Sequence, residues 1–385
     1  MPIHFTESEF ADRKARAIRA LEGRGLDGIL LFAPESHFWL TGYDTFGFSM
    51  FQAMVLSATG DVRLLTRLPD MRQAQQTSIL SDDEIVIWTE VEGASPATDL
   101  AALVRDMGLA GKSLGIETRT AGLTYANGAA VHSALDGVAT LTDASDLITL
   151  ERRHKSEQEI AYHRRAAELS DDALDACMDI AEPGAFEGDI LAAMQGAVFK
   201  GGGDYAGNEF IIGSGPTALL VRYHAGRRHL DPVDQLTLEW SGAYRRYHAA
   251  MMRTIVVGEP TDHQRKMHAA CVEAMEACEA AIRPGNTMGA VFDAHAEIFD
   301  RNGLNHARFQ ACGYGMGAVY NPIWVDFPMF YHGNPLTMDE GNVFFLHMIL
   351  NDSDAGYAMS YGHSVLVKAD GVERLSRHSL DMLVV

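Results

Sequence analysis

The chain has 385 residues, 47% of them hydrophobic, so it is long enough to bury the cores of two domains. Its formal net charge of -21 at pH 7 argues against nucleic acid or an anionic membrane surface as a partner, because both would repel it. A small-molecule substrate is the partner that this composition favours, and no stretch has the length of a membrane span.

The N-terminal segment predicts a helix and not a targeting signal. Charges are spread along it, and no apolar run of signal-peptide length occurs. Thr6 and Glu9 have capping-box spacing, and the stretch to about Glu22 suits an amphipathic helix. Four cysteines without a CxxC pair complete the pattern of a reduced, cytoplasmic protein.

The chain up to about residue 150 alternates strands with helices. DGILLF indicates a buried strand, and HFWLTGYD leads from it into a turn. Further strands are predicted at residues 51–57, 62–65, 84–88 and 112–116. This alternation predicts an α/β domain over residues 1–150.

The segment 152–174 is polar with helical apolar spacing and opens a second domain, residues 151–385. Pro183-Gly184 and Pro284-Gly285 each mark the end of a helical run. The chain contains no GxSxG, HExxH or P-loop motif, and no GxGxxG after a strand.

One cassette carries most of the functional information. Between Ala218 and Thr254 the chain reads ALLVRYHAGRRHLDPVDQLTLEWSGAYRRYHAAMMRT. It resembles the core of the creatinase/aminopeptidase (pita-bread, peptidase M24) family, whose metal-dependent members carry a strand-ending Asp and a second Asp eleven residues later. Glu239 stands at the first of these positions and Ala250 at the second. The family's frame survives as Gly242, Tyr247, Arg253 and Thr254.

Three downstream motifs show the same replacement of metal ligands. GYGMG resembles the family's GHGIG with Tyr314 at the His position, and NVFFLH resembles VFTIE with His347 at the Glu position. YGHSVLV resembles IEDTVLV with Gly362 at the fifth ligand. A dinuclear site for hard cations needs several carboxylates, which this set does not supply. We therefore expect neither a metal ion nor another cofactor.

The resemblance covers most of the chain and implies its architecture. A creatinase-like α/β N-terminal domain is expected over residues 1–150. An α+β pita-bread catalytic domain is expected over residues 151–385.

Glu239 is the first candidate for catalysis. It ends the apolar strand QLTLE, and the resemblance points it into the central pocket. A carboxylate buried without cations must be hydrogen-bonded or have a raised pKa, and either suits a base or nucleophile. Ectoine hydrolases, metal-free relatives, are similar here, with Glu at this position and RRYH after it, as at residues 245–248. The alternative is a structural glutamate paired with an arginine.

Histidines supply the remaining catalytic candidates. His347 lies on an apolar strand whose equivalent faces the site in the family, although such a histidine is commonly a satisfied core residue. His248 and His363 are further candidates for proton transfer, next to the replaced ligand positions.

Substrate-binding candidates follow from the same alignment. Arg222 occupies the position of a substrate-contacting His, and its planar fork suits a carboxylate; a surface salt bridge is the alternative. His224 lies on the same side if that segment is extended. Tyr314 and Tyr320 stand at two His positions, where phenols would stabilise an oxyanion or simply fill space. His332 lies in a segment that would form a lid.

The leading functional hypothesis is a metal-independent hydrolase of a C–N bond in a small zwitterionic nitrogen compound, creatine-like or ectoine-like. Glu239 would attack or activate water. One alternative is an Xaa-Pro dipeptidase-like metallopeptidase or lyase. The other is a non-catalytic peptide-binding pita-bread module.

A homodimer is expected, because a creatinase-like N-terminal domain would leave an open cleft unless a neighbouring copy closed it. Tyr43, Phe46 and Phe48 in GYDTFGF are the candidates to reach across that interface and contact substrate.

Overall fold

The computed structural model describes residues 3–222 and 226–385. They divide into two compact units. Unit 1 is Met1–Arg152 with Tyr320–Pro322, and unit 2 is Arg153–Val319 with Ile323–Val385. Within the described ranges no helix combines the length and apolar character that crossing a membrane requires.

Unit 1 is an α/β sandwich, as predicted. Its six strands are ordered β4-β3-β2-β1-β5-β6. The strands are β1 (Gly28–Leu31), β2 (Ala53–Ser57), β3 (Val62–Arg67), β4 (Ile85–Trp88), β5 (Ser113–Ile116) and β6 (Thr140–Asp143). The helices are α1 (Glu7–Gly23), α2 (Pro34–Thr41), α3 (Leu68–Thr77), α4 (Pro96–Asp106), α5 (Tyr125–Leu135) and α6 (Leu147–Glu151).

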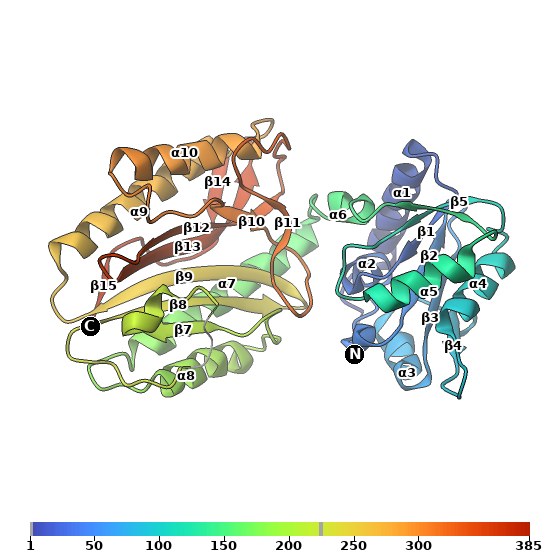
Figure 1. Ribbon diagram of the computed structural model, residues 1–385, viewed down its shortest axis with the longest axis horizontal. Coiled ribbons are helices and arrows are strands. Elements are labelled where there is room, and N and C mark those ends of the chain that lie inside the picture. The colour runs from blue at the N-terminus through green and yellow to red at the C-terminus, as the bar shows by residue number, and fades with distance from the viewer. Residues whose placement is uncertain (1–2, 223–225) are drawn as a thin grey trace. The chain divides into compact units, whose positions relative to one another are not determined.

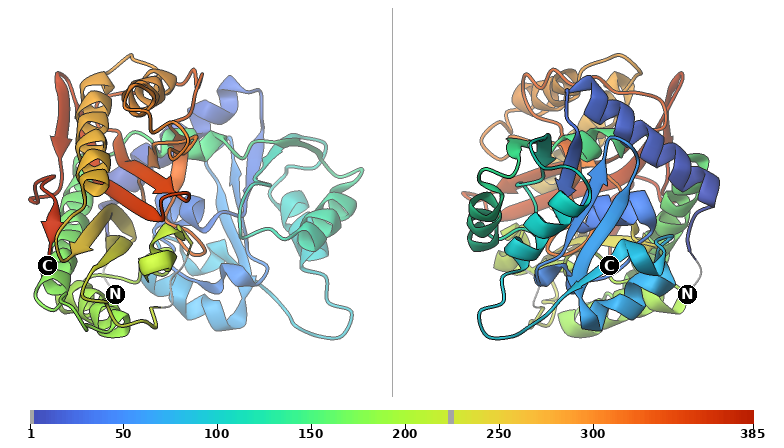
Figure 2. Two further views of the ribbon diagram at one scale, coloured as in Figure 1. Left: turned by 60° about the vertical axis from the view of Figure 1, so that its left-hand side comes forward. Right: turned by 90° about the vertical axis from the view of Figure 1, so that its right-hand side faces the viewer.

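Successive side chains along the strands of unit 1 point to opposite faces of the sheet and pack in two separate cores. Ile29 and Leu31 pack with α1, α2 and α3, whereas Leu30 packs with α4 and α5. Figure 2 (left) shows the teal helices to one side of these strands. The helix predicted from Thr6 forms as α1, because the Thr6 hydroxyl accepts the amide hydrogen of Glu9.

Unit 2 is an α+β domain built on one long, mainly antiparallel sheet. Its strand order is β11-β10-β12-β13-β9-β8-β7, with β14 on β13 and β15 on β9. The longer strands are β8 (Asp234–Tyr244), β9 (Tyr247–Val257), β12 (Val343–Asp352) and β13 (Tyr357–Lys368). The shorter ones are β7 (Ile211–Ser214), β10 (Gly313–Gly315), β11 (Asp326–Met329), β14 (Gly371–Arg374) and β15 (Leu383–Val384).

Two helix pairs cover this sheet. They are α7 (Glu157–Met178) with α8 (Glu187–Lys200), and α9 (Asp262–Ala281) with α10 (Met288–Arg301). Figure 1 shows α9 and α10 along β12 and β13, while α8 lies near β7. Gly184 and Gly285, which follow the first helix of each pair, have φ of 90° and 82°, the left-handed region that glycine adopts readily. The two halves therefore repeat one arrangement.

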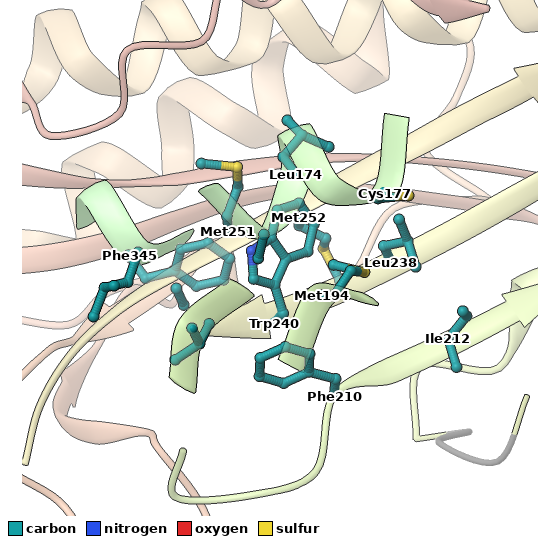
Figure 3. Close-up of a cluster of buried hydrophobic side chains, with 14 of the residues drawn as sticks. Leu174, Cys177, Met194, Phe210, Ile212, Leu238, Trp240, Met251, Met252 and Phe345 are labelled. Carbon is teal, nitrogen blue, oxygen red and sulfur yellow. The ribbon is translucent and has the colours of Figure 1, made fainter. Parts of the chain in front are cut away.

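Separate cores hold the two helix pairs on the strands. Trp240 of β8 lies at the centre of the first core, beside Phe210 and Met194 (Figure 3). Its indole Nε1 donates to the carbonyl oxygen of Ser170 on α7 at 2.9 Å. The second core joins α9 and α10 to β12 and β13 and includes Phe344 and Leu346. The fold that the resemblance implied is confirmed.

Candidate functional site

The register of four central strands places one residue of each in a single row. Glu239 of β8 stands opposite Met252 of β9, and Met252 stands opposite Gly362 of β13. Gly362 in turn stands opposite His347 of β12. Residues paired in this way point to the same side of a sheet. Since Trp240 points to the helices, Glu239 and the rest of its row lie on the opposite, inner face.

A pocket of about 550 Å³ opens on this inner face. All of its lining side chains belong to unit 2. It contains four of the residues proposed from sequence, namely Arg222, Glu239, Tyr314 and His347. Its size is within the usual range for small-molecule sites.

Glu239 is a buried carboxylate in this pocket. Burial raises the pKa of Glu239 to about 7, although the charge of Arg222 and a hydrogen bond from Tyr314 pull it down. Among the described residues, no salt bridge joins Glu239 to an arginine, so Arg222 acts on it at longer range. Glu239 therefore changes its charge near neutral pH, as a proton-transferring group must.

A short hydrogen-bond chain orients the carboxylate. Trp324 Nε1 donates to the Tyr314 hydroxyl oxygen at 2.9 Å, and the Tyr314 hydroxyl donates to Glu239 Oε1 at 3.4 Å. Burial and the negative charge of Glu239 raise the pKa of Tyr314 well above its ordinary value, so the phenol stays protonated. Tyr314 is consequently a hydrogen-bond donor over the whole physiological pH range.

His347 lies on the same face and stays neutral. Burial lowers the pKa of its imidazole to about 4, and the charge of Arg222 acts in the same direction. Its Nδ1 atom is buried and has no hydrogen-bond partner. The imidazole packs against Tyr314 and Phe345, with ring centroids 5.7 Å and 5.6 Å away.

The five positions that the sequence resemblance aligns with the family's metal ligands carry side chains that do not fit a dinuclear centre. They offer one carboxylate, Glu239, and one imidazole, His347, whereas two hard cations need several carboxylates. At Gly362 a Cβ would lie 2.7 Å from Cζ of Phe345 and 2.8 Å from the carbonyl oxygen of Leu346. The ring of Phe345 thus fills the space of the fifth ligand. Within the described parts of the chain, no group of three His, Cys, Asp or Glu residues is arranged to hold a metal ion.

His248 does not line the pocket, and its side chain is hydrogen-bonded to the hairpin turn that precedes β9. Arg245 and Arg246 form the two-residue hairpin turn between β8 and β9, with φ of 50° and 69°. The Nδ1 of His248 donates to the Arg246 carbonyl oxygen at 2.8 Å, and its Nε2 accepts from the amide of Gly207 at 2.9 Å. Both ring nitrogens of His248 are therefore hydrogen-bonded to the backbone. The RRYH sequence forms and stabilises the hairpin turn.

His363 points to the other face of the sheet. It follows Gly362 on β13, so strand alternation turns its side chain toward α9. Its Nε2 donates to Glu279 at 2.8 Å, and Arg374 binds the same carboxylate through Nε and NH2 at 2.7 Å and 2.6 Å. This cluster, in which His363 and Glu279 are buried and Arg374 is exposed, joins β13 and β14 to α9.

The remaining candidates lie elsewhere. His332 is exposed and donates to Asp293, and His224 lies outside the described residues. Tyr320 groups with unit 1, where its hydroxyl donates to Asp44 at 3.0 Å. The aromatic trio of unit 1 differs in exposure: Tyr43 is buried, Phe48 is half-buried and Phe46 is 80% exposed.

Sequence reasoning missed four polar residues of the pocket lining, Trp324, Arg308, Asn208 and Gln310, and the first two have the clearest roles. Trp324 orients Tyr314, and it follows the cis bond Asn321-Pro322 in a loop without secondary-structure pattern. Arg308 lies in the loop between α10 and β10, six positions before Tyr314. Neither lies on a strand motif, so periodicity offered no signal.

Comparisons with known proteins agree with this architecture. Residues 161–369 match metallopeptidase family M24, and residues 13–154 match the creatinase/prolidase N-terminal domain. The uncharacterized hydrolase/peptidase y4tM of Sinorhizobium fredii is 27% identical over 99% of both chains. The ectoine hydrolase of Halomonas elongata is 26% identical over 97% of this chain and 96% of its own. The crystal structure of a Thermococcus sibiricus prolidase superposes with a TM-score of 0.87 at 18% identity, covering 98% of this chain and 99% of that one.

Replacing Glu239 by glutamine should raise the free energy of unfolding at pH 8 and change it little at pH 5. The folded-state pKa of about 7 exceeds the ordinary 4.5, so wild-type stability is greatest below the unfolded pKa and falls as pH rises through 7. One pKa unit corresponds to about 1.4 kcal/mol, so the gain at pH 8 is roughly 3 kcal/mol at most. Urea denaturation of both proteins at both pH values measures it. A lower stability of the variant at pH 8 would contradict the unpaired, buried carboxylate.

His347→Asn and His363→Asn form a matched pair. His363→Asn should lower the free energy of unfolding by about 1–3 kcal/mol, because a buried partner of Glu279 is removed, and it should leave turnover per folded molecule unchanged. His347→Asn should reduce turnover at nearly unchanged stability. Denaturation curves and turnover rates of the two variants test this prediction. Loss of turnover in His363→Asn, with turnover unchanged in His347→Asn, would place the chemistry on the helix-facing side of the sheet.

Proposed function

Because this chain belongs to metallopeptidase family M24, we propose that it is a hydrolase of C–N bonds in which the carboxylate of Glu239 takes over the work of metal ions. The observation that carries this proposal is the buried carboxylate of Glu239, whose pKa is raised to about 7. The other positions that align with the family's metal ligands carry no acidic side chain. The named hydrolases and peptidases among its relatives support the reaction class.

Glu239 acts as the base in this proposal. Its carboxylate accepts a proton from water, and the resulting hydroxide adds to the electrophilic carbon of the substrate. A base with a pKa near neutrality is well matched, because it can then return that proton to the departing nitrogen. The protonated phenol of Tyr314 holds Glu239 in place, and the neutral imidazole of His347 orients the water or the substrate.

A small zwitterionic nitrogen compound is the proposed substrate class. The pocket of about 550 Å³ suits a molecule of that size. The ectoine hydrolase of Halomonas elongata, a relative along nearly the whole chain, supports ectoine-like over Xaa-Pro substrates. The pocket lining combines the carboxylate of Glu239 with two arginines, Arg222 and Arg308, and this suits a substrate that carries both charges.

Two further parts of the proposal come from the sequence. We expect a homodimer, and in unit 1 the exposed ring of Phe46 is the part of the GYDTFGF segment available for contact, since Tyr43 is buried. We also expect a cytoplasmic protein, in keeping with four free and buried cysteines.

A turnover screen of the chelator-treated protein tests the function. Ectoine, creatine and Xaa-Pro dipeptides are the compounds to compare, and we expect hydrolysis of the ectoine-like or creatine-like class without added metal. Glu239→Gln should reduce that rate at least about a hundredfold, the scale of a lost general base. Activity that chelation abolishes and metal restores, or that appears only with Xaa-Pro dipeptides, would overturn the proposal.

The pH dependence of kcat/KM gives a second test. Activity should rise with pH through an apparent pKa of about 7, because the charged form of Glu239 is the active one. Arg222→Gln should move this rise to higher pH, since the charge of Arg222 favours the carboxylate. Arg265→Gln, at an exposed arginine paired with Glu259, is the control and should not move it. An unmoved profile in the Arg222 variant would remove the electrostatic role of that residue.

A further inference from the structure

One corner of the pocket holds buried polar nitrogen atoms that no hydrogen bond within the described residues satisfies. Of the side chains lining the pocket, Arg308 and His347 each carry a buried nitrogen without a partner, NH1 and Nδ1 respectively. A buried donor or acceptor without a partner costs about 1–3 kcal/mol, and most proteins avoid it. NH1 of Arg308 is a donor, whereas Nδ1 of His347 is a donor or an acceptor according to the tautomer. Two such atoms in one pocket indicate a place prepared for a ligand.

The guanidinium of Arg308 is fixed with one edge left free. Its Nε and NH2 donate to Asp300 at 2.7 Å and 3.2 Å, which leaves NH1 unengaged. A bridge between Arg308 and Leu350 ties its backbone to β12, the strand that carries His347. The side chain is mostly buried, whereas Asp300 is 48% exposed, so water screens the Asp300 charge. The guanidinium, whose central carbon lies 5.9 Å from the ring centroid of Phe292, therefore keeps a positive character in the pocket lining.

A second histidine completes the corner behind the pocket wall. His295 of α10 is buried, its Nδ1 has no hydrogen-bond partner, and it is close enough to His347 and Arg308 for their charges to act on it. Burial lowers the pKa of His295 to about 3, and the positive charges of His347 in its protonated form and of Arg308 act in the same direction. Both imidazoles are therefore neutral near pH 7. Arg308 is the permanent cation of the corner.

The two arginines of the pocket serve different neighbours. Arg222 acts on Glu239, Tyr314 and His347, because its charge contributes to the pKa of each. Arg308 instead acts on His295 and is held by Asp300. A substrate carboxylate bound at Arg222 would compete with Glu239 for that charge, whereas one bound at Arg308 would not.

We propose that Arg308, with His347 beside it, forms the carboxylate-binding corner of the pocket and selects substrates with a carboxylate at the end remote from the scissile C–N bond. That the bound molecule is a substrate with a scissile bond rests on the proposed function, whereas the binding of a carboxylate at this corner does not. Phe309 and Ile349 line the pocket as well and would contact the apolar part of such a molecule. Repulsion by Glu239 would keep the carboxylate away from the reacting end.

Binding of two probes tests the corner without any need for turnover. N-acetylglycine carries a carboxylate, and N-acetylglycinamide has nearly the same shape without the charge. Ligand-observed NMR titrations at constant ionic strength and pH 7.5 should show the wild-type protein binding the acid at least about tenfold more tightly than the amide. Equal binding of both probes by the folded wild-type protein would overturn the proposal, whatever the variants do.

Four variants show which residue binds the carboxylate. Arg308→Gln and Arg308→Met should each lose the preference for the acid, with Met preserving the apolar stem if Gln disturbs folding. Arg301→Gln is the matched control, because Arg301 lies on α10, is half exposed and pairs with Glu273. It should bind both probes as the wild type does. Loss of the preference in Arg222→Gln, with Arg308→Gln unaffected, would assign the carboxylate to the other arginine and overturn the inference.

The outcomes separate this inference from the proposed function. If no candidate compound is hydrolysed but binding of the acid depends on Arg308, carboxylate binding at the corner is supported and the proposed reaction is contradicted. If Glu239→Gln abolishes turnover but acid binding ignores Arg308, the reaction stands and the corner falls.

Discussion

The pairing register of β8, β9, β13 and β12 is the constraint on which the site depends. It sets Glu239, Met252, Gly362 and His347 side by side on the inner face, although the β8–β9 and β12–β13 hairpins are far apart in sequence. A slip of one residue in any of these strands would send its member of the row to the helix-facing side. The large cores beneath α7 to α10, with Trp240 at the centre of one, hold that register in place.

The electrostatics of the pocket follow from the absence of a cation paired with the Glu239 carboxylate among the described residues. Glu239 is buried without a paired cation, so the cost of desolvation falls on its charged form and moves its pKa toward neutrality. Arg222 and Tyr314 reduce that cost without cancelling it. Such an arrangement sacrifices some folding stability to hold a reactive group, a compromise common at functional sites.

Much of this could be predicted from sequence, and the limits have physical causes. Motifs on continuous strands identified Glu239 and His347, and the structure brings both to one pocket. The same motifs also suggested His363, but its neighbour Gly362 takes the inward position and strand alternation sends His363 outward. Arg308 lies in a loop, where only long-range packing decides what a side chain meets.

Gly362 also bears on how this pocket could have changed over time. The ring of Phe345 occupies the volume that any side chain at position 362 would need, so the two residues are mutually dependent. Restoring a carboxylate at 362 by a single substitution would meet the ring and the Leu346 carbonyl together. A side chain at position 362 therefore requires a smaller residue than Phe345 and also a shift of the Leu346 backbone, and replacing Phe345 alone would leave a cavity beside Tyr314. Each of the two substitutions is disfavoured when it is made alone, so the packing of Phe345 against Gly362 opposes a change at either position.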